Sequence, residues 1–254
     1  MKKHNNTVNL ATRLVTNDAP FAIREAFNQL RTNLMYTISD NSNGAPVIAV
    51  TSTNEHAGKS TIITNLAVAF SQLNKKVLLV DGDMRCPVVH KFFELDNKDM
   101  GLSELISGIA NEDCKHTVME NLDVITSGRI PPNPSELITS PRFADRIQQW
   151  KKEYDIIFVD FPPVGIVTDC IACCNNITAY IFVVRAGKCS AKSIKSCMEM
   201  MDQVGAKVAG VVLNDYDIKI SDRYKYKYRY RYRYRNSRYV SSMYGYNNPE
   251  SKND

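Results

Sequence analysis

The sequence has no long run of apolar residues and no apolar stretch directly behind its basic first residues. A helix that crosses a bilayer needs about 20 predominantly apolar residues, so we expect none. The N-terminus, MKKHNNTVNLATR, lacks the apolar core of a secretory signal peptide. We therefore expect a cytoplasmic protein that reaches the inner face of the cell membrane only through a partner.

The sequence also lacks a regular cysteine framework, although it contains seven cysteines. Cys170 and Cys173 have the C-x-x-C spacing of zinc and redox sites, but no second Cys or His pair follows them. Reduced, partly buried thiols in a cytoplasmic protein are the better interpretation. A zinc or redox site is the weaker alternative.

Acidic residues are scarce at the C-terminus. Residues 223–254 contain nine Lys or Arg and two Asp or Glu, whereas the whole chain has a net charge of +5. The rest of the chain is therefore slightly acidic, so the net charge does not indicate a nucleic-acid-binding body. We expect a flexible segment over 1–20, one folded domain over 21–221, and a flexible, basic, tyrosine-rich tail over 222–254.

The hydrophobic pattern of the folded part predicts alternating strands and helices. Buried strands are predicted over 47–52, 77–83, 122–128, 154–161, 177–187 and 208–214, and helices over 21–38, 59–73, 135–150 and 191–204, with two short helices within 86–130. Such alternation is typical of βαβ units with right-handed crossovers. We therefore predict an α/β fold with a doubly wound, mostly parallel sheet and helices on both faces.

The segment Thr51–Thr61, TSTNEHAGKST, follows a predicted strand and opens a predicted helix, which is the context of a P-loop. The backbone N–H groups and the dipole at such a helix start attract phosphate, and Gly58 lets the backbone approach it closely. Lys59 supplies a positive charge for the β- and γ-phosphates, and Ser60 supplies a hydroxyl for Mg²⁺. The predicted nucleotide-binding residues of the loop are Thr53, Asn54, Glu55, His56, Ala57, Gly58, Lys59, Ser60 and Thr61.

This loop departs from the usual pattern G-x-x-x-x-G-K-[ST] at its first position, where Thr53 replaces glycine. Glu55 adds a negative charge that repels phosphate, whereas a protonated His56 would attract it. A small-residue helix start that binds no ligand is the competing interpretation. Two further motifs weigh against it.

Three carboxylates are predicted at the same edge of the sheet as this loop. Asp81 and Asp83 follow the apolar strand VLLV, and Asp160 ends the apolar strand IIFV. In open α/β sheets, ligands bind at the carboxyl ends of the strands. A single aspartate at a strand end often only caps a loop, but three such positions together predict a site for a triphosphate and a hard cation.

These motifs resemble those of the bacterial P-loop tyrosine kinases of capsule and exopolysaccharide synthesis, in their cytoplasmic Gram-positive form. VLLVDGDMR (77–85) is similar to the family's Walker A′ motif, and FVDFPPV (158–164) is similar to its Walker B motif. PPNPSELI (131–138) and FVVRAG (182–187) are also phrases of this family. The resemblance implies a P-loop NTPase fold of the deviant Walker type, related to ParA and MinD.

Two segments depart from the family pattern. The family's loop carries Pro and Gly where this chain has Glu55 and His56. The segment EAFNQLRTN (25–33) resembles the family's E-x-x-R-x-x-R oligomerisation motif, but Asn28 replaces its middle arginine. The resemblance implies a homo-oligomer, and the implied oligomerisation residues are Glu25 and Arg31.

The resemblance also implies roles for the residues of the site, with ATP and Mg²⁺ as cofactors. Lys59 would hold the β- and γ-phosphates. Asp81 would orient or deprotonate the attacking tyrosine, whose phenol has a pKa of about 10. Asn214 would lie near the adenine or serve equally well as a strand-end turn residue, and Arg185 is a further nucleotide-site candidate. The implied metal ligands are Ser60, Asp83 and Asp160, and the implied catalytic residues are Lys59, Asp81, Asp83 and Asp160.

The C-terminal tail carries the implied autophosphorylation sites, which alternate in part with Lys and Arg. They are Tyr224, Tyr226, Tyr228, Tyr230, Tyr232, Tyr234, Tyr239, Tyr244 and Tyr246. Each phosphate adds about −1.5 to −2 charges, so roughly four or five would cancel the tail's positive charge. We expect this electrostatic switch to release subunits from one another. Single-stranded nucleic acid is the weaker alternative partner of the same residues.

The predicted function is an ATP-dependent protein-tyrosine kinase that phosphorylates its own tail and other protein tyrosines and regulates polysaccharide synthesis. The resemblance implies that its partner is a membrane-anchored activator of the polysaccharide co-polymerase type. One alternative is a ParA- or MinD-like ATPase, although Asn54 stands near the loop start where such proteins usually carry a signature lysine. Another is a catalytically weak scaffold of the same pathway.

Overall fold

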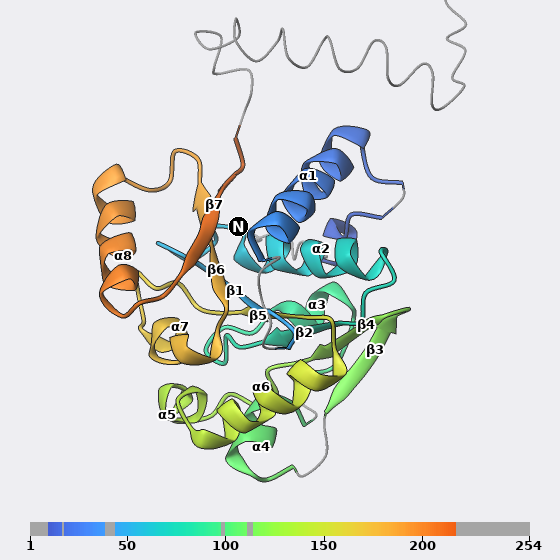
Figure 1. Cartoon of the computed structure of the whole chain (residues 1–254), viewed down its shortest axis with the longest axis vertical. Coiled ribbons are helices and arrows are strands. Elements are labelled where there is room, and N and C mark those ends of the chain that lie inside the picture. Colours follow the sequence, from blue (N-terminus) through green and yellow to red (C-terminus); the bar gives the residue numbers. More distant parts are fainter. Residues whose placement is uncertain (1–9, 17, 39–43, 98–99, 111–113, 217–254) are drawn as a thin grey trace, which may run out of the picture. The chain divides into compact units, whose positions relative to one another are not determined.

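One mixed sheet organises the part of the chain that the computed structural model describes, which is residues 10–16, 18–38, 44–97, 100–110 and 114–216. Its seven strands lie in the order β3-β4-β2-β5-β1-β6-β7 (Figure 1). Every neighbouring pair is parallel except β3 and β4. The strands are β1 (Val47–Ser52), β2 (Val77–Asp81), β3 (Lys115–Met119), β4 (Leu122–Ile125), β5 (Ile156–Asp160), β6 (Ala179–Arg185) and β7 (Val208–Asn214).

Helices cover both faces of this sheet, which confirms the predicted doubly wound α/β class. The helices α1, α2 and α3 pack on one face, and α4 to α8 pack on the other (Figure 1). The helices are α1 (Phe21–Ile38), α2 (Lys59–Ser71), α3 (Val89–Phe92), α4 (Leu102–Ser107), α5 (Pro134–Ile138), α6 (Pro141–Glu153), α7 (Asp169–Ala172) and α8 (Ala191–Gln203), with 3₁₀ turns η1 (Ala11–Arg13) and η2 (Cys174–Asn176).

The apolar runs of the central strands follow from burial on both faces. Ile48 and Val50 of β1 pack into the same cluster as Ile63 of α2. Their neighbours Val47 and Ala49 pack into the cluster on the opposite face. Successive side chains of a strand point to opposite faces, so a strand covered by helices on both sides needs apolar residues throughout.

Several predicted elements begin or end up to three residues away from the observed ones, and two features differ in kind. The helix predicted over 135–150 is two helices, α5 and α6, because Ser140 caps the second and Pro141 is its first residue. The Ser140 hydroxyl accepts a hydrogen bond of 3.3 Å from the backbone N–H of Phe143. Strand β3 was not predicted. It lies at the edge of the sheet, and its residues alternate between exposed and half-buried with none fully buried, so its hydrophobic pattern is weak.

Part of the predicted N-terminal segment packs along α2. The side-chain amide of Asn65 accepts a hydrogen bond of 2.6 Å from the backbone N–H of Val15. The same amide donates to the backbone oxygen of Arg13 at 3.0 Å and to that of Thr61 at 2.9 Å. The buried side chain of Asn65 therefore joins residues 10–16 to the first turns of the helix that begins at Lys59.

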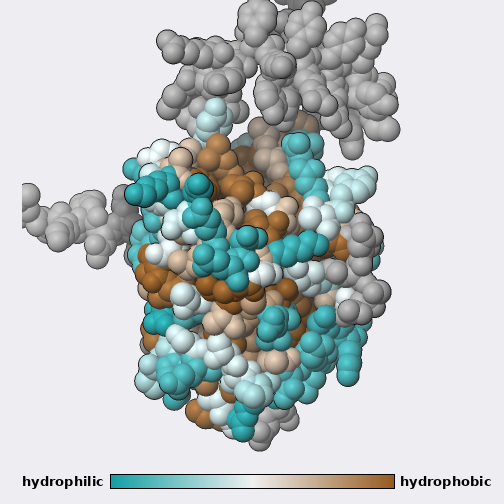
Figure 2. Space-filling model, turned by 60° about the vertical axis from the view of Figure 1, so that its left-hand side comes forward, coloured by the Kyte–Doolittle hydropathy of each residue, from teal (hydrophilic) through white to brown (hydrophobic). Residues whose placement is uncertain are grey.

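The far edge of the sheet exposes apolar side chains. Strand β7 pairs with β6 on one side and exposes Val211 and Leu213. The side of the molecule that Figure 2 brings forward carries apolar patches between hydrophilic residues. Across the described ranges, no helix combines the length and the apolar character needed to span a bilayer.

Replacing Asn65 with alanine should lower the free energy of unfolding by about 1 to 3 kcal/mol, because the partly buried backbone groups of residues 13 and 15 lose their partner. Urea denaturation would measure the change. Asn33→Ala, on the exposed side of α1, should change the free energy by no more than about 0.5 kcal/mol. Equal effects of the two substitutions would mean that the N-terminal segment contributes nothing through Asn65.

Candidate nucleotide-binding site

The predicted loop and carboxylates meet at one edge of the sheet, which confirms that part of the sequence analysis. Strands β2, β5 and β1 are neighbours and run parallel. Asp81 at the end of β2 is in register with Asp160 at the end of β5. Residue Ser52 ends β1, and the P-loop follows it directly. Parallel strands thus bring all these groups to the carboxyl edge, where ligands of this fold class bind.

Gly58 closes the loop in a conformation that a residue with a side chain rarely adopts. Its φ is +95°, in the left-handed region, and α2 begins at the next residue, Lys59. A Cβ at this position would also overlap the side-chain amide of Asn214. That amide donates a hydrogen bond of 2.9 Å to the backbone oxygen of Ala57. Glycine is therefore needed here both for the backbone turn and for the contact with β7.

The unusual loop residues occupy two different kinds of position. Thr53 is buried and is not among the residues with positive φ, so its backbone does not require the glycine of the usual pattern. Instead, Gly165 lies so close to the Thr53 carbonyl that a Cβ there would overlap it. His56 has a φ of +57°, a conformation that costs a residue with a side chain roughly 1 to 2 kcal/mol.

Arg185 and Asn214 contact the loop from the side of β6 and β7. The Arg185 guanidinium donates to the backbone oxygen of His56 at 3.3 Å, next to the contact that Asn214 makes with Ala57. Both residues therefore support the backbone of the P-loop. Their contacts with a nucleotide stay a prediction.

Asp160 is a fully buried carboxylate whose two oxygens have no hydrogen-bond partner of normal geometry in the described part of the chain. Burial raises its pKa to about 6, while the nearby charge of Lys59 and the Ser60 hydroxyl lower it and Asp83 raises it. A buried polar atom without a partner is rare in native proteins and points to a ligand or ion. The oxygen groups of Asp160, Asp83 and Ser60 are the kind that Mg²⁺ prefers.

Asp81 is also fully buried, but the backbone satisfies it. Its Oδ1 accepts from the N–H of Asp83 at 3.3 Å. Its Oδ2 accepts from Val88 at 3.1 Å and from Val89 at 3.0 Å, where α3 begins. Burial raises the pKa of Asp81 well above its ordinary range, and the charge of Asp160 raises it further. Asp81 therefore shapes the loop between β2 and α3 and is a stronger base than an exposed aspartate.

Asp83 lies on this same loop. One of its oxygens, Oδ1, accepts from the backbone N–H of Arg85 at 3.3 Å and from that of Cys86 at 3.0 Å. The side chain of Arg85 forms an ion pair with Asp169. The two backbone bonds set the orientation of the Asp83 carboxylate.

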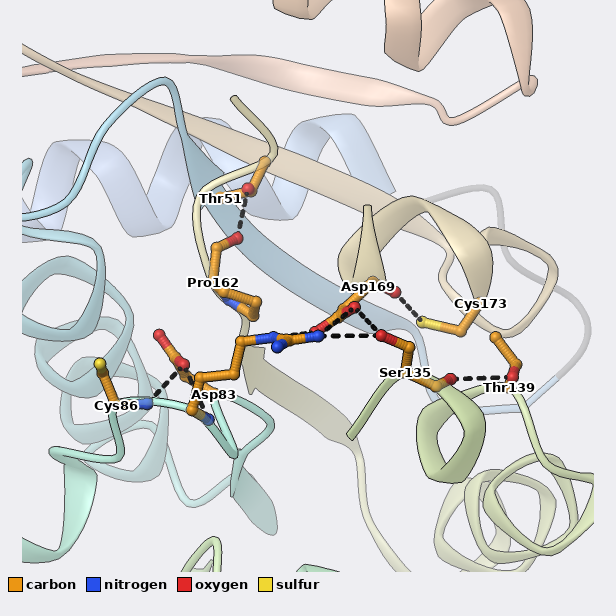
Figure 3. A network of polar contacts seen from close by, with 9 residues as sticks. Thr51, Asp83, Cys86, Ser135, Thr139, Pro162, Asp169 and Cys173 are labelled. Atoms are coloured by element: carbon orange, nitrogen blue, oxygen red, sulfur yellow. Dashed lines mark hydrogen bonds and ion pairs between the residues drawn. The ribbon is translucent and has the colours of Figure 1, made fainter. Parts of the chain in front are cut away.

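Two residues that the sequence analysis missed, Ser135 and Asp169, join the site's outer layer. Arg85 Nε donates to Asp169 Oδ2 at 2.8 Å, and the Ser135 hydroxyl donates to Asp169 Oδ1 at 2.6 Å (Figure 3). Burial alone would raise the pKa of Asp169, but the bonds from Arg85 and Ser135 hold it below its ordinary value. The motif PPNPSELI contained Ser135, but no local pattern links these three positions.

Of the C-x-x-C cysteines, Cys170 lies in α7 and Cys173 directly follows this helix. Cys170 and Cys173 are both buried free thiols, and burial raises the pKa of each well above its ordinary value. Cys170 lies beside the hydroxyl of Thr51, with 3.6 Å between sulfur and oxygen. Both thiols therefore stay protonated at neutral pH.

The remaining predicted positions are placed only in part. Arg31 on α1 donates a hydrogen bond of 2.7 Å to the backbone oxygen of Ala69 on α2, and Glu25 accepts one of 3.1 Å from Asn28. Their role in oligomerisation stays a prediction. The nine predicted autophosphorylation tyrosines, Tyr224 to Tyr246, lie outside the described residues.

Comparison with known proteins agrees with this site. The CobQ/CobB/MinD/ParA nucleotide-binding domain family matches residues 48–240. The tyrosine-protein kinase CpsD of Streptococcus pneumoniae is 37% identical over 204 residues, which are 79% of this chain and 87% of CpsD. CapB of Staphylococcus aureus is 36% identical over 214 residues, or 83% of this chain and 92% of CapB.

Solved structures show the same relationship. The chimerical protein CapA2B2 has a TM-score of 0.74 at 40% identity, covering 80% of this chain and 89% of its own. The kinase domain of the Escherichia coli tyrosine kinase ETK has a TM-score of 0.71 at 31% identity, covering 75% and 74%. MinD of Pyrococcus horikoshii, at 23% identity with a TM-score of 0.58 and coverage of 68% and 71%, shows that the fold is shared with MinD.

Replacing Asp160 with asparagine should stabilise the ligand-free protein at neutral pH. Because the folded-state pKa is raised to about 6, the wild-type free energy of unfolding falls as pH rises from about 4 through 6. The variant lacks this loss and should be more stable by about 1 to 3 kcal/mol at pH 7.5. Urea denaturation across pH 4–8 would measure it, with Asp145→Asn on the exposed side of α6 as the control. If the free energy of unfolding of the variant changes with pH as that of the wild type does, Asp160 is not the carboxylate that destabilises the protein as pH rises.

Proposed function

This chain belongs to the family of CapB- and CpsD-type tyrosine-protein kinases, and we propose that it transfers the γ-phosphoryl group of ATP to protein tyrosines in the control of capsular or exopolysaccharide synthesis. The observation that carries this proposal is the unpartnered carboxylate of Asp160, which lies near Lys59 and Ser60 at the end of β5. A loop that binds phosphate, a buried cation site and a second buried carboxylate are what phosphoryl transfer requires.

Each residue of the site has a task in this reaction. Lys59 binds the β- and γ-phosphates and stabilises the charge that develops on them. Ser60, Asp83 and Asp160 hold the Mg²⁺, which when bound neutralises phosphate charge. Asp81 accepts the proton of the acceptor phenol. As it does so, the phenol oxygen bonds to the γ-phosphorus, and the bond from that phosphorus to the leaving oxygen of ADP breaks. Burial raises the pKa of Asp81, which makes its carboxylate a stronger base for this step.

The acceptors that we propose are the tail tyrosines of this chain and tyrosines of other proteins. The tail alternates Tyr with Lys and Arg over 224–235, so successive phosphorylation would turn a basic segment into an acidic one. Such a charge reversal would weaken contacts between subunits of a homo-oligomer. If phosphorylated and unphosphorylated protein sediment alike at matched concentration, the tail does not control assembly.

The partner that we propose is a membrane-anchored activator of the polysaccharide co-polymerase type. Support comes from the family resemblance and from the chimerical protein CapA2B2 among the related structures. With such a partner the kinase would act on the cytoplasmic side, at the inner face of the membrane. Low activity of the purified chain alone would be consistent with a missing activator.

A second candidate function is a scaffold with weak nucleotide binding. His56 with its left-handed backbone and the negative charge of Glu55 favour it, since both lie where phosphate would approach. A MinD-like ATPase is a third candidate. Incubation with Mg-ATP separates the three: the kinase produces phosphotyrosine, the ATPase releases phosphate without it, and the scaffold does neither.

Replacing Lys59 with methionine should abolish autophosphorylation, because the apolar chain keeps the volume of this buried residue but removes the charge on the phosphates. Phosphotyrosine would be measured by blotting and mass spectrometry after incubation with Mg-ATP and activator. We expect a loss of at least about a hundredfold, comparable to removing another preorganised charged group from an active site.

Lys75→Met is the matched control, since Lys75 is exposed beyond the end of α2 and should leave the signal unchanged. Both variants should still unfold in one cooperative transition, and the Lys59 variant should be the less stable at neutral pH because Asp160 loses a nearby positive charge. A full phosphotyrosine signal from the Lys59 variant would rule out this loop as the phosphoryl-transfer site.

A further inference from the structure

One network of side chains ties together loops that leave three different strands. Arg85 lies on the loop after β2, Ser135 lies in α5 after β4, and Asp169 is the first residue of α7 after β5. Their polar groups meet at one point near the carboxyl edge of the sheet (Figure 3). The neighbouring loops of this edge are therefore held to one another as well as to their own strands.

The contact between Arg85 and Asp169 has the forked geometry of a strong pair. Arg85 Nε lies 2.8 Å from Oδ2 and Nη2 lies 3.3 Å from Oδ1 of Asp169. The same Nη2 also donates to the Ser135 hydroxyl at 2.9 Å. Asp169 is 5% exposed, so water competes little for its carboxylate. Bidentate arginine–carboxylate pairs of this kind are both stronger and more directional than other ion pairs.

The backbone of Arg85 contacts the proposed metal site. Its N–H and that of Cys86 both donate to Asp83 Oδ1. Arg85 thus connects two layers, since its backbone orients Asp83 and its side chain is anchored to α5 and α7. A displacement of the Arg85 side chain would move the two N–H groups that orient this carboxylate.

The far side of the network is anchored to the P-loop strand. The Thr51 hydroxyl of β1 donates to the backbone oxygen of Pro162 at 2.9 Å (Figure 3). It also accepts from the N–H of Val164 at 3.0 Å. These bonds fasten the segment that leads from Asp160 to Asp169. The network therefore has a rigid support on the strand that carries the phosphate-binding loop.

From this geometry we propose that Arg85 is a positioning residue of the kinase: its pair with Asp169, supported by Ser135, holds the Asp83 carboxylate in the orientation that binds Mg²⁺. This inference rests on the proposed function for the identity of the ion. The effect of the pair on the reaction passes through the loop between β2 and α3.

The test combines one measurement on the loop with one on the metal. Hydrogen exchange of the amides of residues 82–89, measured by mass spectrometry on the full ligand-free chain, reports the order of the loop. In Arg85→Ala the amides of Cys86, Val88 and Val89 should exchange about tenfold faster or more, as expected for losing charge-assisted hydrogen bonds. Arg85→Lys should give a smaller increase, because lysine cannot form the fork.

Binding of a fluorescent ATP analogue over a range of Mg²⁺ concentrations gives the second readout. Arg85→Ala should raise the Mg²⁺ concentration needed for half-maximal binding by roughly tenfold, in line with the weaker metal sites left when supporting contacts are removed. Its affinity for the analogue in the presence of EDTA should equal that of the wild type. A residue that only stabilises the fold would lower both affinities together.

Lys195→Ala provides the matched control, since it breaks an exposed ion pair with Glu199 on α8 and should change neither readout. Ser135→Ala removes the two hydrogen bonds of the Ser135 hydroxyl but leaves the Arg85–Asp169 pair, so it keeps the test available if Arg85→Ala does not fold. Unchanged exchange of residues 82–89 in Arg85→Ala, or in Ser135→Ala as its substitute, would overturn the proposal, as would equal losses of affinity with and without Mg²⁺. If the wild-type protein binds the analogue equally well with and without Mg²⁺, that result contradicts the proposed function instead. The exchange data would still decide whether Arg85 orders the loop.

Discussion

The arrangement at the carboxyl edge of this sheet depends on the buried carboxylate of Asp160, whose burial the surrounding structure must stabilise. This carboxylate lies at the end of β5 with both oxygens unpartnered in the described chain, and burying an unpaired ionised carboxylate costs several kcal/mol. Burial pushes its pKa up to about 6, and the charge of Lys59 moves it in the opposite direction. A fold retains such a group only where its surroundings supply stability or where a ligand completes it. The parallel strands on either side of β5 supply that stability.

The same strands explain why the other groups of the site lie where they do. Strands β2, β5 and β1 are buried on both faces, so their positions depend on close packing with little freedom to shift. Asp81 satisfies its own buried charge through three backbone N–H groups, and in doing so it orders the loop that carries Asp83. Two adjacent carboxylates of raised pKa thus have different surroundings. Asp81 accepts hydrogen bonds from the backbone, whereas the oxygens of Asp160 have no such partner in the described chain. That difference suits one for shaping the loop and accepting a proton, and the other for binding a cation.

The sequence was sufficient to predict the inner layer of the site because each of its residues follows a buried strand. Lys59, Asp81 and Asp160 all belong to local motifs whose apolar strands are evident from the pattern. The outer layer could not be predicted in this way. Arg85 and Asp169 are 84 positions apart in the chain, and only the strand order brings their loops together. Strand β3 was missed for a related reason, since a polar edge strand has little hydrophobic signal of its own.

The supports behind the P-loop explain how this chain keeps the loop despite its unusual residues. The left-handed backbone of His56 is strained, because His56 lacks the conformational freedom of glycine. Hydrogen bonds from Arg185 and Asn214 hold the carbonyl groups of His56 and Ala57. Backbone strain of this kind persists only where surrounding contacts determine the conformation. Because those contacts come from the ends of β6 and β7, the loop's shape depends on the sheet and less on its own sequence. The backbone of the loop can therefore keep this shape with His56 in the left-handed region as long as this layer remains in place.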